Sequence, residues 1–425
     1  MPSPRTARHC DVLVIGGGPS GATASYWLAS AGHDVVMVER KSYPREKTCG
    51  DGLTPRSVRQ LLDMGLGDEL AGAGHRYDGL RSHGFGRTLE LKWPEHPDLP
   101  GYGYVITRKD LDALVARRAE KAGAEVWEKS EAIAPLVEQG LVRGGLIKDK
   151  TDPDAEPVEV RARYVVVADG ANSRFGRALG TSRNRSYPLG MAIRGYYYSP
   201  RHDEPWIDSW LDIRDKAGNV LPGYGWIFPV GDGRINVGIG LLSTFNQWKA
   251  VNTTHLLESF VDYAPESWDM RPETACGPAT GGRLPMGLSV GPHAGPTYLV
   301  VGDAGGTINP FNGEGIAYAY ETGRIAADAV HLALASGDGM ALQTYEQRLQ
   351  DTYALYYKVA RAFVKIIGHP QLMRALVTTG MRSRPLMEWV LRIMANLLRP
   401  DELGPAEAAY KAVAAIARLA PERSA

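Results

Sequence analysis

The stretch DVLVIGGGPSG at 11–21 decides the fold of this chain of 425 residues. Its first five residues are mostly apolar, which predicts a short buried strand. The glycines follow in a GxGxxG pattern, and a helix is predicted from 22 to 31. A second strand-like run at 34–38 ends directly before the acid Glu39. This order of strand, glycine loop, helix, strand and acid predicts a βαβ unit that binds a dinucleotide.

Each residue of the glycine loop has its own expected role. Gly16 permits the tight turn, Gly18 lets the backbone approach a pyrophosphate, and Gly21 lets the helix pack closely on the strand. Backbone amides at the start of the helix, near Ser20, then face the phosphates. Glu39 is placed to accept hydrogen bonds from ribose hydroxyls, and an acid there disfavours the 2′-phosphate of NADP. The expected tight ligand is therefore NAD or FAD.

Two later segments favour FAD. Two strand-like runs each end in an acid next to a glycine, and a glycine-rich loop follows the second run. The residues concerned are Asp169, Gly170, Gly302, Asp303, Gly313 and Gly315. An acid at a strand end suits the hydroxyls of a ribityl chain, and the N-terminus of the helix predicted at about 316–335 suits the negative charge of a reduced flavin. FAD is long enough to need such a third site, whereas NAD is not.

Composition excludes several classes of protein. The chain has 48 Lys+Arg and 48 Asp+Glu residues, and a net charge of zero is not that of a globally basic nucleic-acid-binding protein. Cys10, Cys49 and Cys276 are widely spaced and form no disulfide framework or metal motif, which fits a reducing cytosol. No apolar run reaches the roughly 20 residues of a membrane-spanning helix. We therefore expect a cytoplasmic protein that is soluble or peripheral on the cytoplasmic membrane face.

With these motifs the chain resembles the geranylgeranyl reductase family of FAD-dependent oxidoreductases, over nearly its whole length. The segments 44–53, 107–112 and 222–229 also carry this resemblance. The runs CGDGLTPR at 49–56 and LPGYGWIFP at 221–229 look most like the actinobacterial menaquinone reductases. The resemblance implies an α/β fold of the para-hydroxybenzoate hydroxylase type. Its expected parts are a Rossmann-like FAD-binding domain, an antiparallel β-sheet substrate domain and C-terminal helices.

The expected domains are discontinuous in the sequence. The FAD-binding domain is assigned to 8–75, 100–180 and 280–335. The substrate-binding sheet is assigned to 76–99 and 181–279, which are rich in aromatic residues and turns, and a helical region to 336–425.

The resemblance also implies a reaction and further FAD contacts. The reaction is saturation of a C=C bond in an isoprenoid chain, most specifically one isoprene unit of the menaquinone side chain. Further contacts with FAD are implied at Arg40, Cys49, Gly50 and Arg108. For Arg108 the alternative is a solvated side chain, and for Cys49 a small buried apolar residue. No second GxGxxG is present, so NAD(P)H or another electron donor would bind only transiently.

An aromatic row is predicted in the hairpin of 224–230 and 234–240. Tyr224, Trp226 and Phe228 alternate, so all three point to one face of a strand. Core packing is the general interpretation of such a row. The resemblance instead implies that these residues, with Pro229, line the lipid site. An isoprene double bond has no adjacent carbonyl, so its reduction needs positive character at the substituted carbon, which aromatic faces stabilise.

The expected catalytic residues are Cys49, Tyr224 and Trp226. Reduced flavin would deliver the hydride, and an acid would deliver the proton. Cys49 and Tyr224 are both candidates for that acid, and the sequence does not choose between them. A thiolate at Cys49 would need a nearby positive charge, for which Arg45 and Lys47 are the nearest sources in the sequence.

The C-terminal window 351–400 is basic and has helical apolar spacing. It holds eight basic residues against two acidic ones, a net charge of +6. Such a segment can lie on an anionic membrane, or it can be a helical cap with solvated arginines. The menaquinone tail partitions into the bilayer, so this substrate would require contact with the membrane surface.

Three alternative functions share parts of this pattern. The first is reduction of a geranylgeranyl lipid instead of menaquinone. The second is a flavin-dependent aromatic monooxygenase or halogenase, since these enzymes share the fold. The third is a non-catalytic prenyl-binding carrier without flavin, against which the intact glycine motif and Gly302-Asp303 argue.

Overall fold

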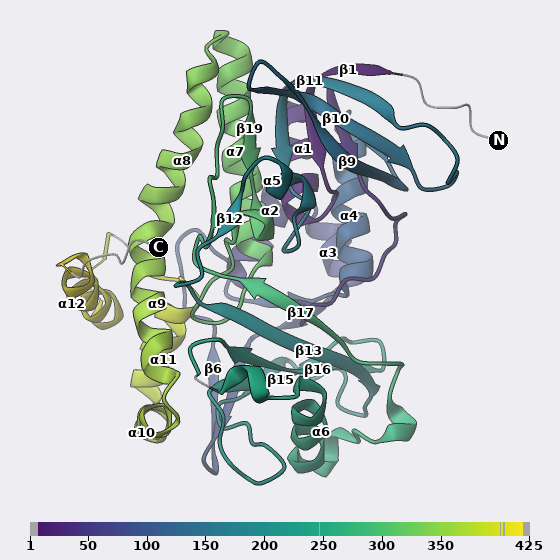
Figure 1. Cartoon of the computed structure of the whole chain (residues 1–425). Helices are drawn as coiled ribbons and strands as arrows, with labels where there is room; N and C mark the ends of the chain where they lie inside the picture. The colour runs from purple at the N-terminus through teal and green to yellow at the C-terminus, as the bar shows by residue number, and fades with distance from the viewer. Residues whose placement is uncertain (1–6, 246, 400, 403, 420–425) are drawn as a thin grey trace.

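The computed structural model describes residues 7–245, 247–399, 401–402 and 404–419. Two large sheets lie one above the other, and long helices run along one side of both (Figure 1). The predicted α/β fold is confirmed.

The first sheet is the dinucleotide-type sheet. Five of its strands are parallel, in the order β8, β2, β1, β11 and β19, and β10 and β9 continue from β11 as antiparallel neighbours. Their bounds are β1 Arg8–Ile15, β2 Val35–Val38, β8 Glu125–Trp127, β9 Ser130–Glu138, β10 Leu141–Asp149, β11 Val158–Val167 and β19 Tyr298–Val300. Apolar runs such as 12–15 and 35–38 are fully buried because a parallel sheet is covered on both faces.

Three helices cover one face of this sheet. They are α1 (Pro19–Ser30), α4 (Arg108–Lys121) and α7 (Ile316–Ser336), and α1 packs against the other two. The helix α4 begins after Thr107, whose side chain caps it by accepting a hydrogen bond from the Asp110 amide. The helix predicted at about 316–335 is also confirmed, and it ends at Gly337 in a left-handed conformation.

The second sheet has seven strands in the order β17, β13, β16, β15, β14, β5 and β6. Their bounds are β5 Gly79–Gly84, β6 Arg87–Lys92, β13 Leu189–Tyr198, β14 Trp206–Trp210, β15 Gly223–Pro229, β16 Arg234–Leu242 and β17 Thr280–Pro285. The predicted hairpin is β15 and β16. The last part of the FAD-binding domain is expected to begin at 280, but β17 pairs with β13, so its residues belong to the second sheet instead. The helix α6 (Thr253–Tyr263) packs on β13 and β16.

Short elements join the two large sheets. The strands β3 (Gly52–Leu53), β7 (Gly103–Val105) and β4 (His75–Tyr77) form a small sheet, and β12 (Ser182–Arg183) pairs with β18 (Val290–Gly291). The short helices are α2 (Pro55–Asp63), which packs on α7, α3 (Gly67–Ala73), which packs on α2, and α5 (Arg174–Ala178), which packs on β9.

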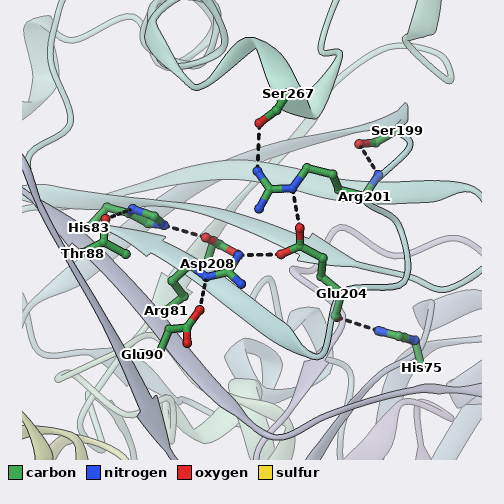
Figure 2. Close-up of polar contacts among 10 residues, drawn as sticks. All are labelled: His75, Arg81, His83, Thr88, Glu90, Ser199, Arg201, Glu204, Asp208 and Ser267. Atoms are coloured by element: carbon green, nitrogen blue, oxygen red, sulfur yellow. Dashed lines mark hydrogen bonds and ion pairs between the residues drawn. The ribbon is translucent and has the colours of Figure 1, made fainter.

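Figure 2 shows a polar network around Asp208 on the second sheet. Asp208 lies opposite Ile227 in the β14–β15 register, so the network is on the face away from the aromatic row. Asp208 is buried there, and its carboxylate contacts His83 Nε2 at 2.5 Å and Arg81 Nη1 at 3.4 Å. Arg81 also pairs with Glu204 at 2.5 Å. The His83 ring stacks on Trp210 with 4.1 Å between centroids. These contacts hold β5 against β14, so the network is a structural support.

The C-terminal helices are α8 (Gln343–Leu349), α9 (Leu355–Ile367), α10 (Pro370–Gly380), α11 (Arg384–Met394) and α12 (Pro405–Leu419), with a π-helical turn at Gln350–Ala354 before α9. The basic charge predicted for 351–400 is only partly at the surface. Arg361 is buried and donates to the Gly287 carbonyl at 2.9 Å, and Arg392 pairs with Glu407. In the part of the chain that the structure describes, none of the helices is long and apolar enough to cross a membrane.

Candidate active site

The glycine loop has the close backbone contacts that the sequence predicted. Gly16 has φ = +98°, and a methyl group there would lie 2.5 Å from the Ala168 carbonyl oxygen. A methyl group at Gly21 would lie 1.9 Å from the Gly16 carbonyl oxygen. Side chains at these positions would therefore separate α1 from the ends of β1 and β11. Gly18 precedes the N-terminus of α1, and a methyl group there would meet only the Arg45 guanidinium, at 3.8 Å, so no backbone crowds the approach of a phosphate.

Glu39 lies buried at the end of β2, and it is held in place by its own surroundings. Its Oε2 accepts a hydrogen bond from the Gly17 amide at 3.1 Å, and its Oε1 accepts one from the Lys41 amide at 3.0 Å. Arg45 pairs with the same carboxylate at 3.2 Å. A carboxylate has about four acceptor positions, so capacity remains for ribose hydroxyls.

Arg45 and Arg108 are joined through Asp112. Arg108 binds the Asp112 carboxylate with both Nε (2.7 Å) and Nη2 (2.9 Å), and Arg45 contacts it at 2.9 Å. Arg108 is buried, so the alternative of a solvated side chain is wrong. The guanidinium of Arg45 lies beside Gly18. Sequence analysis missed this cation next to the phosphate loop, because it considered Arg45 only as a partner for Cys49.

The acids at the ends of β11 and β19 differ in their surroundings. Asp169 Oδ2 accepts hydrogen bonds from the amides of Arg174 (2.8 Å) and Phe175 (3.0 Å), so this oxygen caps α5. Asp169 Oδ1 is buried, and it has no hydrogen-bond partner in the described part of the chain. Burial raises the pKa of Asp169.

Asp303 offers a carboxylate to which none of the described residues donates a hydrogen bond. Gly315, at the start of α7, brings its Cα close to this acid, since a methyl group at Gly315 would lie 3.4 Å from Asp303 Oδ1. Gly302 has φ = +58° and packs on Ser20 at the start of α1. Free acceptors at two strand ends, beside a loop that admits backbone contact, fit the hydroxyls and phosphates of FAD.

The aromatic row forms as predicted on one face of β15. The ring centroids of Tyr224 and Trp226 are 5.8 Å apart, and those of Trp226 and Phe228 are 6.2 Å apart. The glycines of the CGDG loop pack on this row. A methyl group at Gly50 would lie 3.4 Å from Trp226 Nε1, and one at Gly52 would lie 3.0 Å from the Phe228 ring. The loop can lie flat on the aromatic faces because it lacks side chains there.

Asp51 ties the CGDG loop to the second sheet. It is fully buried with φ = +66°, a conformation that costs energy for a residue other than glycine. Its Oδ2 accepts hydrogen bonds from Asn236 Nδ2 (2.8 Å) and the Tyr196 hydroxyl, and its Oδ1 accepts one from the Arg108 amide (3.3 Å). Burial raises the pKa of Asp51 to about 6.

Asn236 links Asp51 to the aromatic row. Its Oδ1 accepts a hydrogen bond from Trp226 Nε1 at 2.9 Å, and its Nδ2 also donates to the Cys49 carbonyl at 2.9 Å. Sequence analysis missed both Asp51 and Asn236. The position of Asp51 between two glycines was a usable signal for the first, but the sequence carried none for the second.

The two predicted proton donors are both neutral in the folded protein. Burial raises the pKa of the Cys49 thiol, and the cation that opposes this shift is Arg108. Arg45, which the sequence offered for this role, pairs instead with Glu39 and Asp112. Burial also raises the pKa of Tyr224, whose hydroxyl donates to the Asn312 carbonyl at 2.7 Å.

Glu314 is a further carboxyl group in this region, two residues after Asn312, whose carbonyl binds the Tyr224 hydroxyl. Its Oε1 accepts hydrogen bonds from the Thr54 hydroxyl and from Ser57 Oγ at 3.3 Å. Its Oε2 is buried and has no partner among the residues that the structure describes. Burial raises its pKa to about 7. Arg40, by contrast, is exposed at the end of β2, and Pro229 is buried at the end of β15.

Comparison with known proteins identifies the family. Residues 9–230 match the model of the FAD binding domain family. The chain is 38% identical over 417 residues to a menaquinone reductase of Mycobacterium tuberculosis, covering 97% of each chain.

The chain belongs to the FAD-binding family that includes the menaquinone and geranylgeranyl reductases.

Other members of this family and a related fold support the assignment. A digeranylgeranylglycerophospholipid reductase of Thermoplasma acidophilum is 30% identical, covering 81% of this chain and 84% of that one. The crystal structure of a geranylgeranyl bacteriochlorophyll reductase-like protein of the same organism superposes with a TM-score of 0.78 at 25% identity, covering 96% of this chain and all of that one. A flavin-dependent brominase structure has a TM-score of 0.75 at 19% identity, with coverages of 96% and 99%, and so shows only the shared fold. The protein is thus an FAD-dependent oxidoreductase, as predicted.

Proposed function

We propose that the protein saturates a C=C bond of an isoprenoid chain, and specifically one isoprene unit of the menaquinone side chain. The observation that carries this proposal is the aromatic row of Tyr224, Trp226 and Phe228, which packs against the CGDG loop of the FAD-binding half. The similarity to menaquinone reductase over nearly the whole chain supports the choice of substrate.

FAD, when bound and reduced, supplies a hydride. Gly16, Gly18, Glu39 and Asp303, with Arg45 beside the loop, are the residues that would hold it. The aromatic row would bind the prenyl chain and face the carbon that becomes positive, because the π faces of Trp and Tyr attract cations. Asn236 fixes the orientation of Trp226 through the 2.9 Å hydrogen bond to its indole. Cys49 lies on the CGDG loop, which packs on the aromatic row.

The experiment that tests the substrate is lipid analysis of a deletion strain. Deletion of the gene is expected to leave the menaquinone side chain fully unsaturated by mass spectrometry, and the wild-type gene is expected to restore the saturated unit. Purified protein with FAD and a chemical reductant should saturate added menaquinone. An unchanged menaquinone profile with a loss of saturation in geranylgeranyl lipids would overturn the menaquinone assignment and support the related lipid instead. An NAD(P)H-dependent oxygenated or halogenated aromatic product would support the monooxygenase or halogenase alternative.

We further propose that α10 and α11 contact an anionic membrane surface. These helices lie at the end of the molecule farthest from β1 (Figure 1). On α10, Leu372 is 50% exposed and Leu376, one turn later, is 48% exposed. The cations Lys365, Arg374, Arg382 and Arg384 are exposed on and between α9, α10 and α11. Apolar side chains flanked by cations are the combination that binds lipid headgroups and the acyl boundary together.

Vesicle flotation tests this contact. The double variant Leu372→Ser/Leu376→Ser is expected to lose binding to vesicles that contain anionic lipid. The matched control is Ile133→Ser/Val137→Ser on β9, which replaces residues of similar exposure (47% and 55%) on the other large sheet. Equal binding of both variants would exclude α10 as the contact.

A further inference from the structure

We propose that Glu314 is the acid that supplies the proton when the isoprenoid double bond is saturated. This inference rests on the proposed function and answers a question that the sequence left open between Cys49 and Tyr224. Glu314 lies on the turn between the aromatic row and the expected FAD site.

The two neighbours of Glu314 contact opposite sides of the site. A methyl group at Gly313 would lie 3.4 Å from the Tyr224 hydroxyl oxygen, and the Asn312 carbonyl accepts the hydrogen bond of that hydroxyl. A methyl group at Gly315 would lie 3.4 Å from Asp303 Oδ1. Glu314 thus belongs to the short turn that joins the aromatic row to the acid expected to hold FAD.

One oxygen of Glu314 is held and the other is free. Oε1 accepts hydrogen bonds from Thr54 and Ser57 at the N-terminus of α2, which fixes the carboxyl group. Oε2 is buried without a partner in the described chain. A buried oxygen without a donor is costly as part of a carboxylate, but as part of a protonated carboxyl it can carry the hydrogen. This is the arrangement expected of a proton donor.

Two charged and four titratable but uncharged groups surround Glu314. They are Arg56 on α2, Tyr77 on β4, Tyr224 on β15, Tyr318 and Glu321 on α7, and Tyr356 on α9. Arg56 lowers the pKa of Glu314. Its effect is limited because Arg56 is paired with Glu321 at 2.7 Å, and the charge of Glu321 raises the same pKa. Burial therefore dominates and raises the pKa of Glu314 to about 7. An acid is most effective when its pKa lies near the working pH, a condition that Tyr224 does not meet.

The proposed step balances in atoms and electrons. The π bond breaks, and two C–H bonds form on the adjacent carbons. One hydrogen arrives as a hydride with both electrons, which is the chemistry that reduced FAD supplies and which leaves FAD oxidised. The other arrives as the proton of Glu314, which is left as a carboxylate. A nicotinamide-class donor then restores the reduced flavin, and solvent restores the proton.

Infrared titration of the oxidised protein tests the proton store without turnover. We expect a protonated-carboxyl C=O band that disappears as the pH rises through about 7 and that is missing in Glu314→Gln. A spectrum of Glu314→Gln identical to that of the wild type at pH 6 would overturn the proposal. Asp328→Asn, on the exposed side of α7, is the control and should retain the band.

Single-turnover reduction of menaquinone by the pre-reduced protein tests the transfer. The wild-type rate should fall with rising pH above about 7, because the carboxyl must be protonated. Glu314→Gln should be slower by about 10²- to 10³-fold and lose this dependence, and Glu314→Asp should recover part of the rate. A wild-type pH profile in Glu314→Gln would overturn the proposal, whereas a wild-type protein that leaves the prenyl chain unsaturated would overturn the proposed function.

Thr54→Val is a second variant, which leaves the Glu314 carboxyl in place. Thr54 donates to the carboxylate and thereby lowers its pKa. Without the Thr54 hydroxyl, the single-turnover rate should begin to fall at a higher pH than in the wild type, and the rate below pH 6 should be unchanged. A merely structural Glu314 would show no such shift, and that result would overturn the proposal.

Discussion

The side-chain amide of Asn236 donates a hydrogen bond to the Asp51 carboxylate at 2.8 Å, across 185 residues of sequence. Asp51 lies in the CGDG loop of the FAD-binding half, and Asn236 lies on β16 of the second sheet. The same amide group also bonds the Cys49 carbonyl and the Trp226 indole. One side chain thus sets the distance between the loop and the aromatic row.

Replacement of Asn236 by leucine should loosen this junction. Asn236→Leu keeps the size but leaves a buried carboxylate oxygen and a carbonyl with fewer donors, at a cost of about 1–3 kcal/mol. Chemical denaturation should show that loss, and isoprenoid reduction should fall while the flavin content stays near that of the wild type. A variant with full activity would show that the loop is positioned by other contacts.

Trp226→Ala should lower reduction without loss of flavin. The residue lies on the second sheet and faces the loop, so its removal weakens substrate binding more than FAD binding. The change also removes a buried side chain, which costs about 3–5 kcal/mol of stability. Activity per bound flavin is therefore the measurement, and Trp226→Phe, which keeps an aromatic face, is the control. If flavin is lost in Trp226→Ala, the row is structural.

Glu39→Gln should weaken FAD binding. The carboxylate would lose its charge-assisted hydrogen bonds to ribose and its pairing with Arg45, and such bonds are worth about 1.5–3 kcal/mol each. Fluorescence titration of the apoprotein with FAD should show a weakening of about 10- to 100-fold. Asp34→Asn, which changes an exposed acid directly before β2, should bind FAD like the wild type.

Glu314 should also make stability depend on pH. Its pKa is about 7 in the folded protein and near the ordinary 4.5 in the unfolded chain. Between these values the folded protein binds more protons, so this contribution is fully present below pH 4.5 and is lost as the pH rises to about 7. Glu314→Gln removes the effect, and its stability relative to the wild type should rise across that window by on the order of 3 kcal/mol. Unfolding temperatures of both proteins at pH 5 and pH 8 would measure the difference, and a constant difference would contradict this prediction.

The network on the other face of the second sheet should affect stability alone. Arg81→Met removes the arginine that pairs with the buried Asp208 and leaves the contact with His83 in place. The free energy of unfolding should fall by about 3 kcal/mol, because a buried carboxylate loses an ion-pair partner. Flavin content and activity per folded molecule should not change, since Asp208 lies opposite Ile227 in the β14–β15 register and therefore faces away from Trp226. Loss of flavin in this variant would connect the network to the active site.

The sequence by itself determined the dinucleotide-binding half and the aromatic row. Both depend on local rules: a buried strand followed by GxGxxG forms one turn, and alternate residues of a strand share a face. The cap at Thr107 and the helix after Gly315 follow from equally short patterns.

The tertiary structure alone decided the partners of the buried polar groups. Glu314 meets Thr54 across 260 residues, Asp51 meets Asn236 across 185, and Arg45 turns to Glu39 and Asp112 instead of Cys49. The surface charge of the C-terminal helices was likewise overestimated, because Arg361 and Arg392 bind groups that only the fold brings near them. The pKa of a carboxyl is set by its burial and by the donors around it, and both arise when distant segments pack together.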